Sequence, residues 1–442
     1  MEIRDPIHGT IEISKSETKI IDHPIFQRLR SIKQLGFAEF SFPGATHNRY
    51  LHSIGVTHLA GVIFDHIFKD YPFSSQRRKD QFRQVVRLSA MLHDIGHGPL
   101  SHTIEEVMPN LEKLKIQIYS RRREDMDLGE DYLKKLNNPK RRATHEDYTI
   151  KIITDSELTE TLKNNFSDIS PENIACLIDK TLEAQDDFFE DNGVNFRGLL
   201  SQIVSSELDA DRLDYLERDA YFCGATYGRI ELSWLISNMT YYNSGGDLHL
   251  ALNRRALYAF DDFLLSRHHM HLMVYFHHKC LIYEEILMRY LTSPDCTFKL
   301  PGNISEYVKY TDYFLYEHLA QSRNLWAKRI AQKNPYKVLF EYHSVSPNNR
   351  CLQMKKSIEE QGIDVVLANS TTRLSKYHTA SPEERSLKIY VVDQYDHLLD
   401  PYPIEESTEI FQKYEEIRRI ERLYVASENF DNAQKIIRSK KL

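Results

Sequence analysis

Apolar side chains recur at helical spacing through most of the chain up to about residue 290, and no other sequence feature constrains the fold as strongly. Phe82, Val85, Val86 and Leu92 are one example, because residues three or four positions apart lie on the same face of a helix. Among 442 residues only 16 are Gly and 15 are Pro, fewer than a β-sandwich with many tight turns requires. The sequence therefore predicts a mainly α fold built around a helical body.

The pattern changes after about residue 305. A helix is expected over residues 313–333, followed by β-rich runs over 337–343, 363–368 and 387–392. A last helix is expected because apolar and aromatic residues again recur at helical spacing, at Ile410, Tyr414, Ile417, Ile420 and Tyr424. This mixture of strands and helices predicts a small α+β lobe.

The chain is longer than one ordinary core can fill, so we predict two units. The first is the helical body, over residues 1–300. Charged sequence without a sustained apolar face over about residues 108–143 predicts an exposed insertion in this body. The second unit is the C-terminal α+β lobe, over residues 301–442, which we expect to serve oligomerisation or regulation.

Charge and cysteine usage exclude several classes of protein. With 57 Lys and Arg against 64 Asp and Glu, the formal net charge is −7, so no overall positive field attracts nucleic acid or an anionic membrane. The 5 cysteines include no C-x-x-C pair, which argues against a disulfide framework or a cysteine zinc site. The chain shows no signal peptide and no apolar run long enough to span a bilayer, so we expect a cytoplasmic protein.

A dense group of histidines predicts a functional site. In Leu92-His93-Asp94-Ile95-Gly96-His97-Gly98-Pro99-Leu100-Ser101-His102, an apolar helix runs into an adjacent His and Asp and is then broken by Gly and Pro. One imidazole and one carboxylate suit a borderline divalent cation, which needs further ligands, such as His52 and a carboxylate within residues 209–214. The alternative is a structural His-Asp pair, the commoner case for an isolated dipeptide.

Two further helices carry polar stripes that suit a phosphorylated ligand. Each stripe has three polar residues spaced four positions apart: Asp211, Tyr215 and Asp219 with Arg212 beside them, and Arg267, His271 and Tyr275. Guanidinium, imidazole and phenol groups on one face suit an oligophosphate and a sugar. The alternative for the first stripe is an exposed helix face of alternating charge.

Five stretches of the chain carry a family resemblance. They are Asp5-Pro6-Ile7-His8-Gly9, Phe26-Gln27-Arg28-Leu29-Arg30-Ser31-Ile32-Lys33-Gln34-Leu35-Gly36, Phe42-Pro43-Gly44-Ala45-Thr46-His47-Asn48-Arg49, His93 through His102, and Asp209 through Asp219. In this order they resemble the HD-domain deoxynucleoside triphosphate triphosphohydrolases, in the branch of the vertebrate sterile-alpha-motif-and-HD enzyme and its bacterial relatives. The resemblance covers about residues 1–290 and fades in the C-terminal lobe. It implies an HD-domain body that cleaves a dNTP to a deoxynucleoside and triphosphate.

The resemblance also implies the roles of the histidine-rich residues. One transition metal, which is iron, manganese or zinc, is expected on His52, His93, Asp94 and Asp211. The catalytic and phosphate-contacting residues are expected to be His97, His102 and His145, with Glu105 standing where the family usually has Asp. Such a metal lowers the pKa of a water that attacks the α-phosphorus, while an acid, here His102 oriented by Glu105, protonates the departing 5′-oxygen.

Substrate contacts follow from the same resemblance. The triphosphate, accompanied by Mg²⁺, is expected on Arg49, Arg212, Tyr215 and Arg267, with His271 on the same stripe as Arg267. The deoxyribose is expected among Gln34, Leu35, Asp219 and Tyr275. The vertebrate enzyme has Lys where Arg212 stands, so the charge is kept while a planar fork replaces a point charge.

Regulation by nucleotides is implied as well, because the same branch forms nucleotide-bound tetramers. Asp22, Gln27 and Arg30 match guanine-reading positions of the effector pocket. Met1 and Arg4 stand where the vertebrate enzyme has Lys and Asn, so we expect a homotetramer with a different effector, such as a dNTP in place of GTP. The alternative for Gln27 and Arg30 is an ordinary charged helix face.

Two other functions stay open at the level of the sequence. One is an HD phosphohydrolase that acts on other nucleotides, although the Arg and Tyr stripes favour a substrate with three phosphates. The other is a nucleotide sensor in defence against phage whose hydrolysis is secondary, although the complete set of metal-ligating residues favours catalysis. Nucleic-acid cleavage is disfavoured by the acidic balance of the chain.

Overall fold

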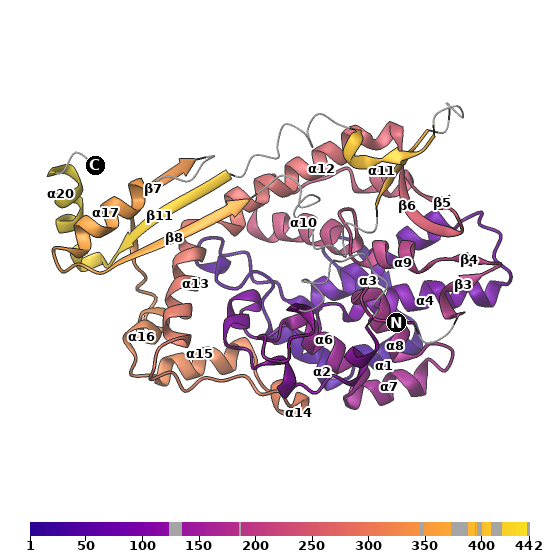
Figure 1. Ribbon diagram of the computed structural model, residues 1–442, viewed down its shortest axis with the longest axis horizontal. Helices are drawn as coiled ribbons and strands as arrows, with labels where there is room; N and C mark the ends of the chain where they lie inside the picture. Colours follow the sequence, from indigo (N-terminus) through magenta and orange to yellow (C-terminus); the bar gives the residue numbers. More distant parts are fainter. Residues whose placement is uncertain are drawn as a thin grey trace.

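The chain folds into a helical body from which a smaller α+β lobe projects (Figure 1). The structure is a computed structural model that describes residues 1–122, 135–184, 187–344, 349–372, 388–393, 395, 400–407 and 418–439. The mainly α fold predicted from the helical periodicity is confirmed. The principal helices up to residue 291 are α1 (Lys15–Ile21), α2 (Pro24–Gln27), α3 (Arg49–Ile67), α4 (Gln76–Leu92), α6 (His145–Thr154), α7 (Glu157–Asn165), α8 (Pro171–Ile178), α9 (Arg197–Val204), α10 (Ala210–Cys223), α11 (Leu232–Ser237), α12 (Leu257–Met270) and α13 (His278–Leu291).

Helix α3 lies at the centre of this body. It begins at Arg49 because the side chain of Asn48 accepts a hydrogen bond from the backbone of Leu51 (3.1 Å). It buries residues on every side rather than along one stripe, which is typical of a helix surrounded by others. Helices α4 and α10 pack against it, so the polar residues that each of the three carries are brought to one place.

The predicted apolar face of residues 82–92 is buried in α4. Phe82, Val85, Val86 and Leu92 are all fully buried. Ser75 caps the start of the helix, since its side chain accepts a hydrogen bond from the backbone of Arg78 (3.2 Å), and His93 caps its end, directly before the loop that carries Asp94.

Three sheets accompany the helices in the described part of the chain. Strands β1 (Glu2–Asp5) and β2 (Gly9–Glu12) form an antiparallel N-terminal hairpin. A six-stranded sheet runs in the order β10-β9-β6-β4-β3, with β5 paired to β6. Its strands are β3 (Glu190–Asp191), β4 (Val194–Asn195), β5 (Met239–Ser244), β6 (Asp247–Asn253), β9 (Tyr390–Val392) and β10 (Tyr402–Pro403).

The third sheet belongs to the projecting lobe, which lies at the upper left of Figure 1. Strand β11 (Arg418–Val425) is its centre, with β7 (Lys337–Ser344) and β8 (Val365–Thr372) antiparallel on either side. Helices α17 (Arg350–Glu359) and α20 (Phe430–Ser439) cover this sheet. Cys351, Met354, Leu423 and Ala433 lie in a core separate from the main one.

Two expectations for the C-terminal part were wrong. Ile420 and Tyr424 lie in strand β11, not in a helix, while residues 410–417 fall outside the described part. A spacing of four is shared by a helix face and by alternate positions of a strand, so it could not separate the two. The helix expected over 313–333 is two helices, α15 (Asp312–Gln321) and α16 (Leu325–Ala331), because Asn324 caps a new helix start.

The lobe is also less independent than the sequence suggested. Strand β9, predicted as part of the run over 387–392, pairs in parallel with β6 of the body, not with the sheet of the lobe. Helices α14 (Ile304–Tyr307), α15 and α16 contribute Tyr307, Leu315 and Ile330 to the main core. The division at residue 300 remains a prediction, and these contacts show that packing continues across it.

The stretch expected as an exposed insertion is described at residues 108–122 and 135–143, while residues 123–134 fall outside the described part. Met108, Leu111, Leu114 and Ile118 are buried, so its first part is packed onto the body instead of being exposed. The 5 cysteines all lie in the described part and form no disulfide there; Cys223 and Cys296 are only half-buried. No helix in the described ranges has the length and apolarity to cross a membrane.

Candidate metal centre and histidine cluster

Four residues from three helices meet at the contact between α3, α4 and α10. His52 lies in the first turn of α3, His93 ends α4, Asp94 follows it, and Asp211 lies in the first turn of α10. Nε2 of His52 lies 2.9 Å from Oδ1 of Asp211 and 3.6 Å from Oδ2 of Asp94. Nε2 of His93 lies 3.5 Å from Oδ1 of each of the two aspartates. The structure thus brings together the four residues predicted as metal ligands.

Local sequence explains why these side chains converge. Asp209 caps α10 by accepting a hydrogen bond from the backbone of Arg212 (2.7 Å), which places Asp211 in the first turn. After α4 the chain turns sharply and passes α6. At Gly96 a side chain would overlap the carbonyl oxygen of His145 and the backbone nitrogen of Thr149, so this close approach requires Gly.

Hydrogen bonds fix the orientation of both imidazoles. Nδ1 of His93 lies 2.8 Å from the carbonyl oxygen of Ala90, which can only accept, so Nδ1 carries the proton. Nδ1 of His52 lies 2.8 Å from Oδ2 of Asp214. In both residues Nε2 is therefore the atom directed at Asp211. Both Nε2 atoms are buried, and their close polar neighbours among the described residues are the carboxylates of Asp94 and Asp211.

These observations fit a divalent cation. Two ligands about 2.1 Å from one ion at the tetrahedral angle lie about 3.4 Å apart, close to the 2.9 to 3.6 Å separating these nitrogen and oxygen atoms. Two imidazoles with two carboxylates suit zinc, iron or manganese. Each imidazole makes a hydrogen bond at Nδ1, the nitrogen that faces away from the proposed ion, and this is the usual arrangement of a metal-binding histidine.

The electrostatics of the centre favour positive charge. Burial alone would lower the pKa of His52, but hydrogen bonds and charges of Asp211 and Asp214 raise it to about 10. Burial raises the pKa of Asp94, but the charges of Arg49 and His93 and a hydrogen bond with His97 outweigh burial and hold it well below its usual range. Asp211, whose carboxylate helps to retain a proton on His52, is a group that would attract a cation in place of that proton.

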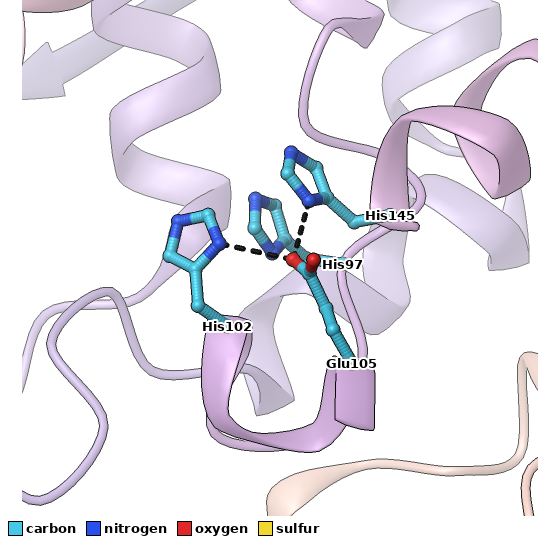
Figure 2. Close-up of side chains that lie close together, drawn as sticks. All are labelled: His97, His102, Glu105 and His145. Atoms are coloured by element: carbon cyan, nitrogen blue, oxygen red, sulfur yellow. Dashed lines mark hydrogen bonds and ion pairs between the residues drawn. The ribbon is translucent and has the colours of Figure 1, made fainter. Parts of the chain in front are cut away.

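A second group of residues lies beside this centre (Figure 2). Oε1 of Glu105 lies 2.9 Å from Nδ1 of His102 and 2.6 Å from Nδ1 of His145. The rings of His97 and His145 stack with their centroids 3.8 Å apart. Nε2 of His97 lies 3.2 Å from Oδ1 of Asp94, which links the two groups. The residues predicted as catalytic are thus adjacent, and the long side chain of Glu105 reaches both outer histidines.

The members of this cluster differ in charge and exposure. Burial raises the pKa of Glu105, but hydrogen bonds from His102 and His145 lower it to about 2. Burial lowers the pKa of His145, but Glu105 and Glu146 reverse this and raise it. Burial and the charge of Arg49 hold the pKa of His97 well below its usual range. The side chain of His102 is 70% exposed, whereas that of His97 is 1% exposed.

The polar stripe of α10 faces the end of α12. Tyr275 donates a hydrogen bond to Oδ2 of Asp219 (2.7 Å), and its ring lies 6.4 Å from that of Tyr215 and 5.0 Å from that of His271. Arg267 pairs with Glu207 (2.7 Å). Arg212, on α10, lies 3.9 Å from the same carboxylate. Neither stripe is an exposed, solvated face, because Asp219 of the first stripe and Arg267 of the second are buried.

The second stripe does not lie on one regular helix. Helix α12 ends at Met270, a π-helix covers His271–Tyr275, and α13 starts at His278. Such π-helical turns are rare and occur often at functional sites. The sequence spacing of four was read as a continuous α-helix, which was wrong at this turn.

The remaining predicted substrate residues lie at the edge of both groups. Arg49 is buried, pairs with Asp94 and donates to Oγ of Ser101 (3.0 Å). The backbone of Gln34 donates to the carbonyl oxygen of His47 (3.1 Å), and Leu35 packs against Ala38 and Cys280. Arg49 therefore contacts the metal centre directly, and Gln34 is linked to Asp219 through His47.

The three predicted effector residues lie near one another at the surface. Gln27 donates to the carbonyl oxygen of Ile21 (2.7 Å), next to Asp22. Arg30 donates to Oε1 of Gln27 (2.8 Å) and stacks over the ring of Tyr50 at 3.6 Å. Their predicted role remains a prediction.

Sequence reasoning missed the partners of several of these residues. His47 lies 2.8 Å from Oδ1 of Asp219 and stacks on Phe222. Glu207 contacts Arg212 and Arg267. Asp214 supports His52 and pairs with Arg218. The spacing of Asp214 and Arg218, four positions apart in a helix, was a signal for a charge pair.

The fold and the site together define a helical protein with a buried centre of one isolated His, an adjacent His-Asp pair and a distant Asp. Comparison with known proteins agrees: a model of the HD domain matches residues 49–219, and a model of the HD-associated region matches residues 230–373. The chain is therefore an HD-domain protein that carries an HD-associated region.

Its relatives include proteins with and without an assigned activity. It is 31% identical over 340 residues to the uncharacterised protein MJ1154 of Methanocaldococcus jannaschii, covering 77% of this chain and 59% of that one. It is 27% identical over 390 residues to the deoxynucleoside triphosphate triphosphohydrolase SAMHD1 of Gallus gallus, covering 83% and 59%. The chain thus spans less than two thirds of both relatives. A hypothetical protein of Aquifex aeolicus of solved structure is similar over 99% of both chains, with a TM-score of 0.72 and 25% identity.

Proposed function

We propose that this protein hydrolyses deoxynucleoside triphosphates to a deoxynucleoside and triphosphate at the joined metal centre and histidine cluster. The observation that carries the proposal is the contact of His97 with Asp94 at 3.2 Å, which supports an acid-base role for the histidine cluster beside the proposed cation site. The similarity to SAMHD1 of Gallus gallus, whose name states this activity, supports the substrate class.

The ion on His52, His93, Asp94 and Asp211 supplies, when bound, a Lewis acid that lowers the pKa of water and polarises a phosphoryl oxygen. The chain's own residues do the rest. Arg49 has its guanidinium against Asp94 and can contact a phosphate held beside that carboxylate. His97, held neutral, can donate or accept a hydrogen bond at the phosphate without adding charge.

His102 is assigned as the proton donor to the departing 5′-oxygen. Its Nδ1 donates to Glu105 at 2.9 Å, so Nε2 is the nitrogen left to face a substrate, and it gives up a proton from the imidazolium form of the ring. Its exposure allows contact with a bound ligand, whereas the buried His97 has no such access. Glu105 also orients His145 and is a positioning residue for both imidazoles.

The cations and phenols beyond this cluster are assigned to the nucleotide. Arg212, Tyr215, Arg267 and His271 are assigned to the triphosphate, which Mg²⁺ accompanies, and the two arginines also contact Glu207. The deoxyribose is assigned to Gln34, Leu35, Asp219 and Tyr275, because Asp219 joins Tyr275 and, through His47, the segment of Gln34.

Product identification tests the reaction. Purified protein is incubated with each dNTP, with and without a second nucleotide as activator, and the first products are separated by anion-exchange chromatography. Triphosphate plus deoxynucleoside is expected. Pyrophosphate plus dNMP, or phosphate plus dNDP, would show that the α-phosphorus ester to the sugar is not the bond cleaved and would favour an HD phosphohydrolase acting differently on nucleotides.

Two variants test the residues. Asp211→Ala should lose the stoichiometric iron, manganese or zinc measured by inductively coupled plasma mass spectrometry; an unchanged metal content would remove Asp211 from the ligand set. His102→Ala should keep the metal and slow turnover by about 10² to 10⁴, the range for loss of a positioned general acid. A protein that binds nucleotide but turns none over would favour the sensor function.

A further inference from the structure

The carboxylate of Asp214 is surrounded by four hydrogen-bonding nitrogens. Oδ2 lies 2.8 Å from Nδ1 of His52 and 2.8 Å from Nε of Arg218. Oδ1 lies 2.8 Å from Nη2 of Arg218 and 2.7 Å from Nε2 of His8. Since both oxygens are occupied, Asp214 has no position left for a metal ion, although it lies only three residues from Asp211. Its one contact with the metal centre is through the far side of His52.

Two of the groups that hold this carboxylate lead to the N-terminal hairpin. Nη1 of Arg218 donates to Oδ2 of Asp5 (2.8 Å), the last residue of β1. Oδ1 of the same aspartate accepts from the backbone of Ile7 and of His8 (2.9 Å each). Asp5 therefore both fixes Arg218 and shapes the turn that delivers His8 to Asp214.

The network is closed to water and tightly packed. The side chains of Asp5, His8, Asp214 and Arg218 are between 0% and 4% exposed. Helix α3 approaches it at Gly55, where a side chain would overlap the carboxylate of Asp214 and the guanidinium of Arg218. A charged network with this little freedom can hold the one ring that it contacts in a single orientation.

We infer that the N-terminal hairpin is a working part of the metal centre: Asp5 and His8, through Arg218 and Asp214, hold the His52 imidazole in the tautomer and orientation that present Nε2 to the ion. The four are positioning residues and touch neither metal nor substrate. Because a carboxylate behind a metal-binding histidine fixes its tautomer and raises its basicity, loss of the network lowers metal affinity without removing a ligand. This inference rests on the metal proposed at His52.

The test is a measurement of metal affinity that needs no substrate. Apoprotein is titrated with Zn²⁺ in competition with a chromophoric chelator, for the wild type and for Asp214→Asn, Asp5→Asn and Arg4→Ala. Arg4→Ala is the matched control, since Arg4 is in the same hairpin but donates its hydrogen bond to the exposed Thr10 (2.7 Å), outside the network around Asp214. Asp214→Asn should weaken Zn²⁺ binding about 10- to 100-fold, Asp5→Asn by a smaller factor in the same direction, and Arg4→Ala by less than about twofold.

Circular dichroism and urea unfolding of each variant separate this role from a structural one. A purely structural role would lower the unfolding midpoint yet leave the affinity of the folded fraction unchanged, and this result would overturn the inference. If Asp214→Asn does not fold, Asp5→Asn decides in the same way. If the wild type itself binds no Zn²⁺, the proposed metal centre is wrong. If the wild type and all variants bind Zn²⁺ with the same high affinity, only the role of the hairpin is wrong.

Discussion

Asp312 accepts hydrogen bonds from two backbone amides that are far apart in the sequence. Oδ1 accepts from Leu100 (2.8 Å), in the loop between His97 and His102, and Oδ2 accepts from Lys33 (2.9 Å), next to Gln34. One side chain at the start of α15 thus holds two segments of the proposed active site. Burial raises the pKa of Asp312 to about 6, against the opposing effect of these donors.

This pKa shift predicts how stability depends on pH. The carboxyl has a pKa near 3.8 when exposed, so the folded state favours its protonated form, and the corresponding stability is present below about pH 4 and lost as pH rises to about 6. The loss is at most about 3 kcal/mol. The unfolding free energy of the wild type minus that of Asp312→Asn, measured by urea titration of apoprotein from pH 4 to 7, should fall by up to this amount. A difference independent of pH would contradict the prediction.

Gly55 allows α3 and α10 to approach each other. Ala has the higher helix propensity, by about 1 kcal/mol, so a glycine in mid-helix is unfavourable unless space requires it. Here an added methyl group would displace the Asp214–Arg218 pair, and breaking a buried pair typically costs about 3 to 5 kcal/mol. Gly55→Ala should therefore lower the unfolding free energy by a net of about 2 to 4 kcal/mol.

Urea unfolding measures this effect, and Val62→Ala is the control. Val62 lies on the same helix but is exposed, so its substitution should change stability by less than about 1 kcal/mol. Equal stability of Gly55→Ala and wild type would mean that the network yields to the methyl group at little cost.

At the scale of residues, the sequence predicted those site residues that are close neighbours within one short motif. His93 and Asp94 are adjacent and end an apolar helix, so their spacing alone indicated a candidate site. The contact between His8 and Asp214 joins residues 206 positions apart and has no such signature. Such a contact depends on how the helices pack, which one sequence does not reveal.

At the scale of elements, α6 begins at His145 itself. The side chain of Thr144 accepts a hydrogen bond from the backbone of Asp147, and the side chain of Asp147 accepts one from the backbone of Thr144, forming a capping box. Helix α7 starts with the same motif at Ser156, which follows the opposite end of α6 from His145. The two caps allow a comparison between helix stability and placement of a catalytic residue.

Thr144→Ala and Ser156→Ala should each cost about 1 kcal/mol of unfolding free energy, because each removes one N-cap. Only Thr144→Ala should also reduce kcat, by about tenfold, since the loosened turn moves His145 away from Glu105. Steady-state kinetics and urea unfolding of both variants check this. Equal losses of activity would show that cap stability, not the position of His145, governs turnover.

The elements also show where sequence patterns are ambiguous. The apolar face of α4 was predicted correctly because several positions agree on one period. Residues 420 and 424 are four apart and fit a strand as well as a helix, and β-branched and aromatic side chains at these positions favour the strand that forms. The π-helix at residues 271–275 preserves the proximity of Arg267 and His271 while changing the turn that carries them, which spacing could not reveal.

At the scale of the whole molecule, we expect a homotetramer whose population rises when a nucleotide binds near Asp22, Gln27 and Arg30. A ligand favours the assembled state only through its differential affinity, so an effector at 100 times its dissociation constant contributes at most about 2.7 kcal/mol per site. Multi-angle light scattering with each dNTP and with GTP should show the shift. Arg30→Ala should abolish it, because Arg30 both orders Gln27 and stacks on Tyr50. If neither assembly nor rate responds to any nucleotide, these residues are an ordinary helix face.

The overall architecture was predictable in its helical part and less so beyond it. Sustained helical periodicity up to about residue 290 gave the mainly α body, because many weak signals add over a long segment. The pairing of β9 with β6 joins residues 390–392 to 251–253, and a run of three residues carries no information on its partner. The order of elements along the chain therefore suggested one separate C-terminal lobe, whereas in the structure strands of the body and of the lobe alternate along this part of the chain.

That interleaving has a consequence for how the chain can be divided. In chain order, β7 and β8 lie in the sheet of the lobe, β9 and β10 lie in the sheet of the body, and β11 lies in the sheet of the lobe again. A truncation after residue 300 would therefore remove two strands of the body along with the lobe, and would uncover the edge of β6 on which β9 pairs. No single cut in the chain separates the two units.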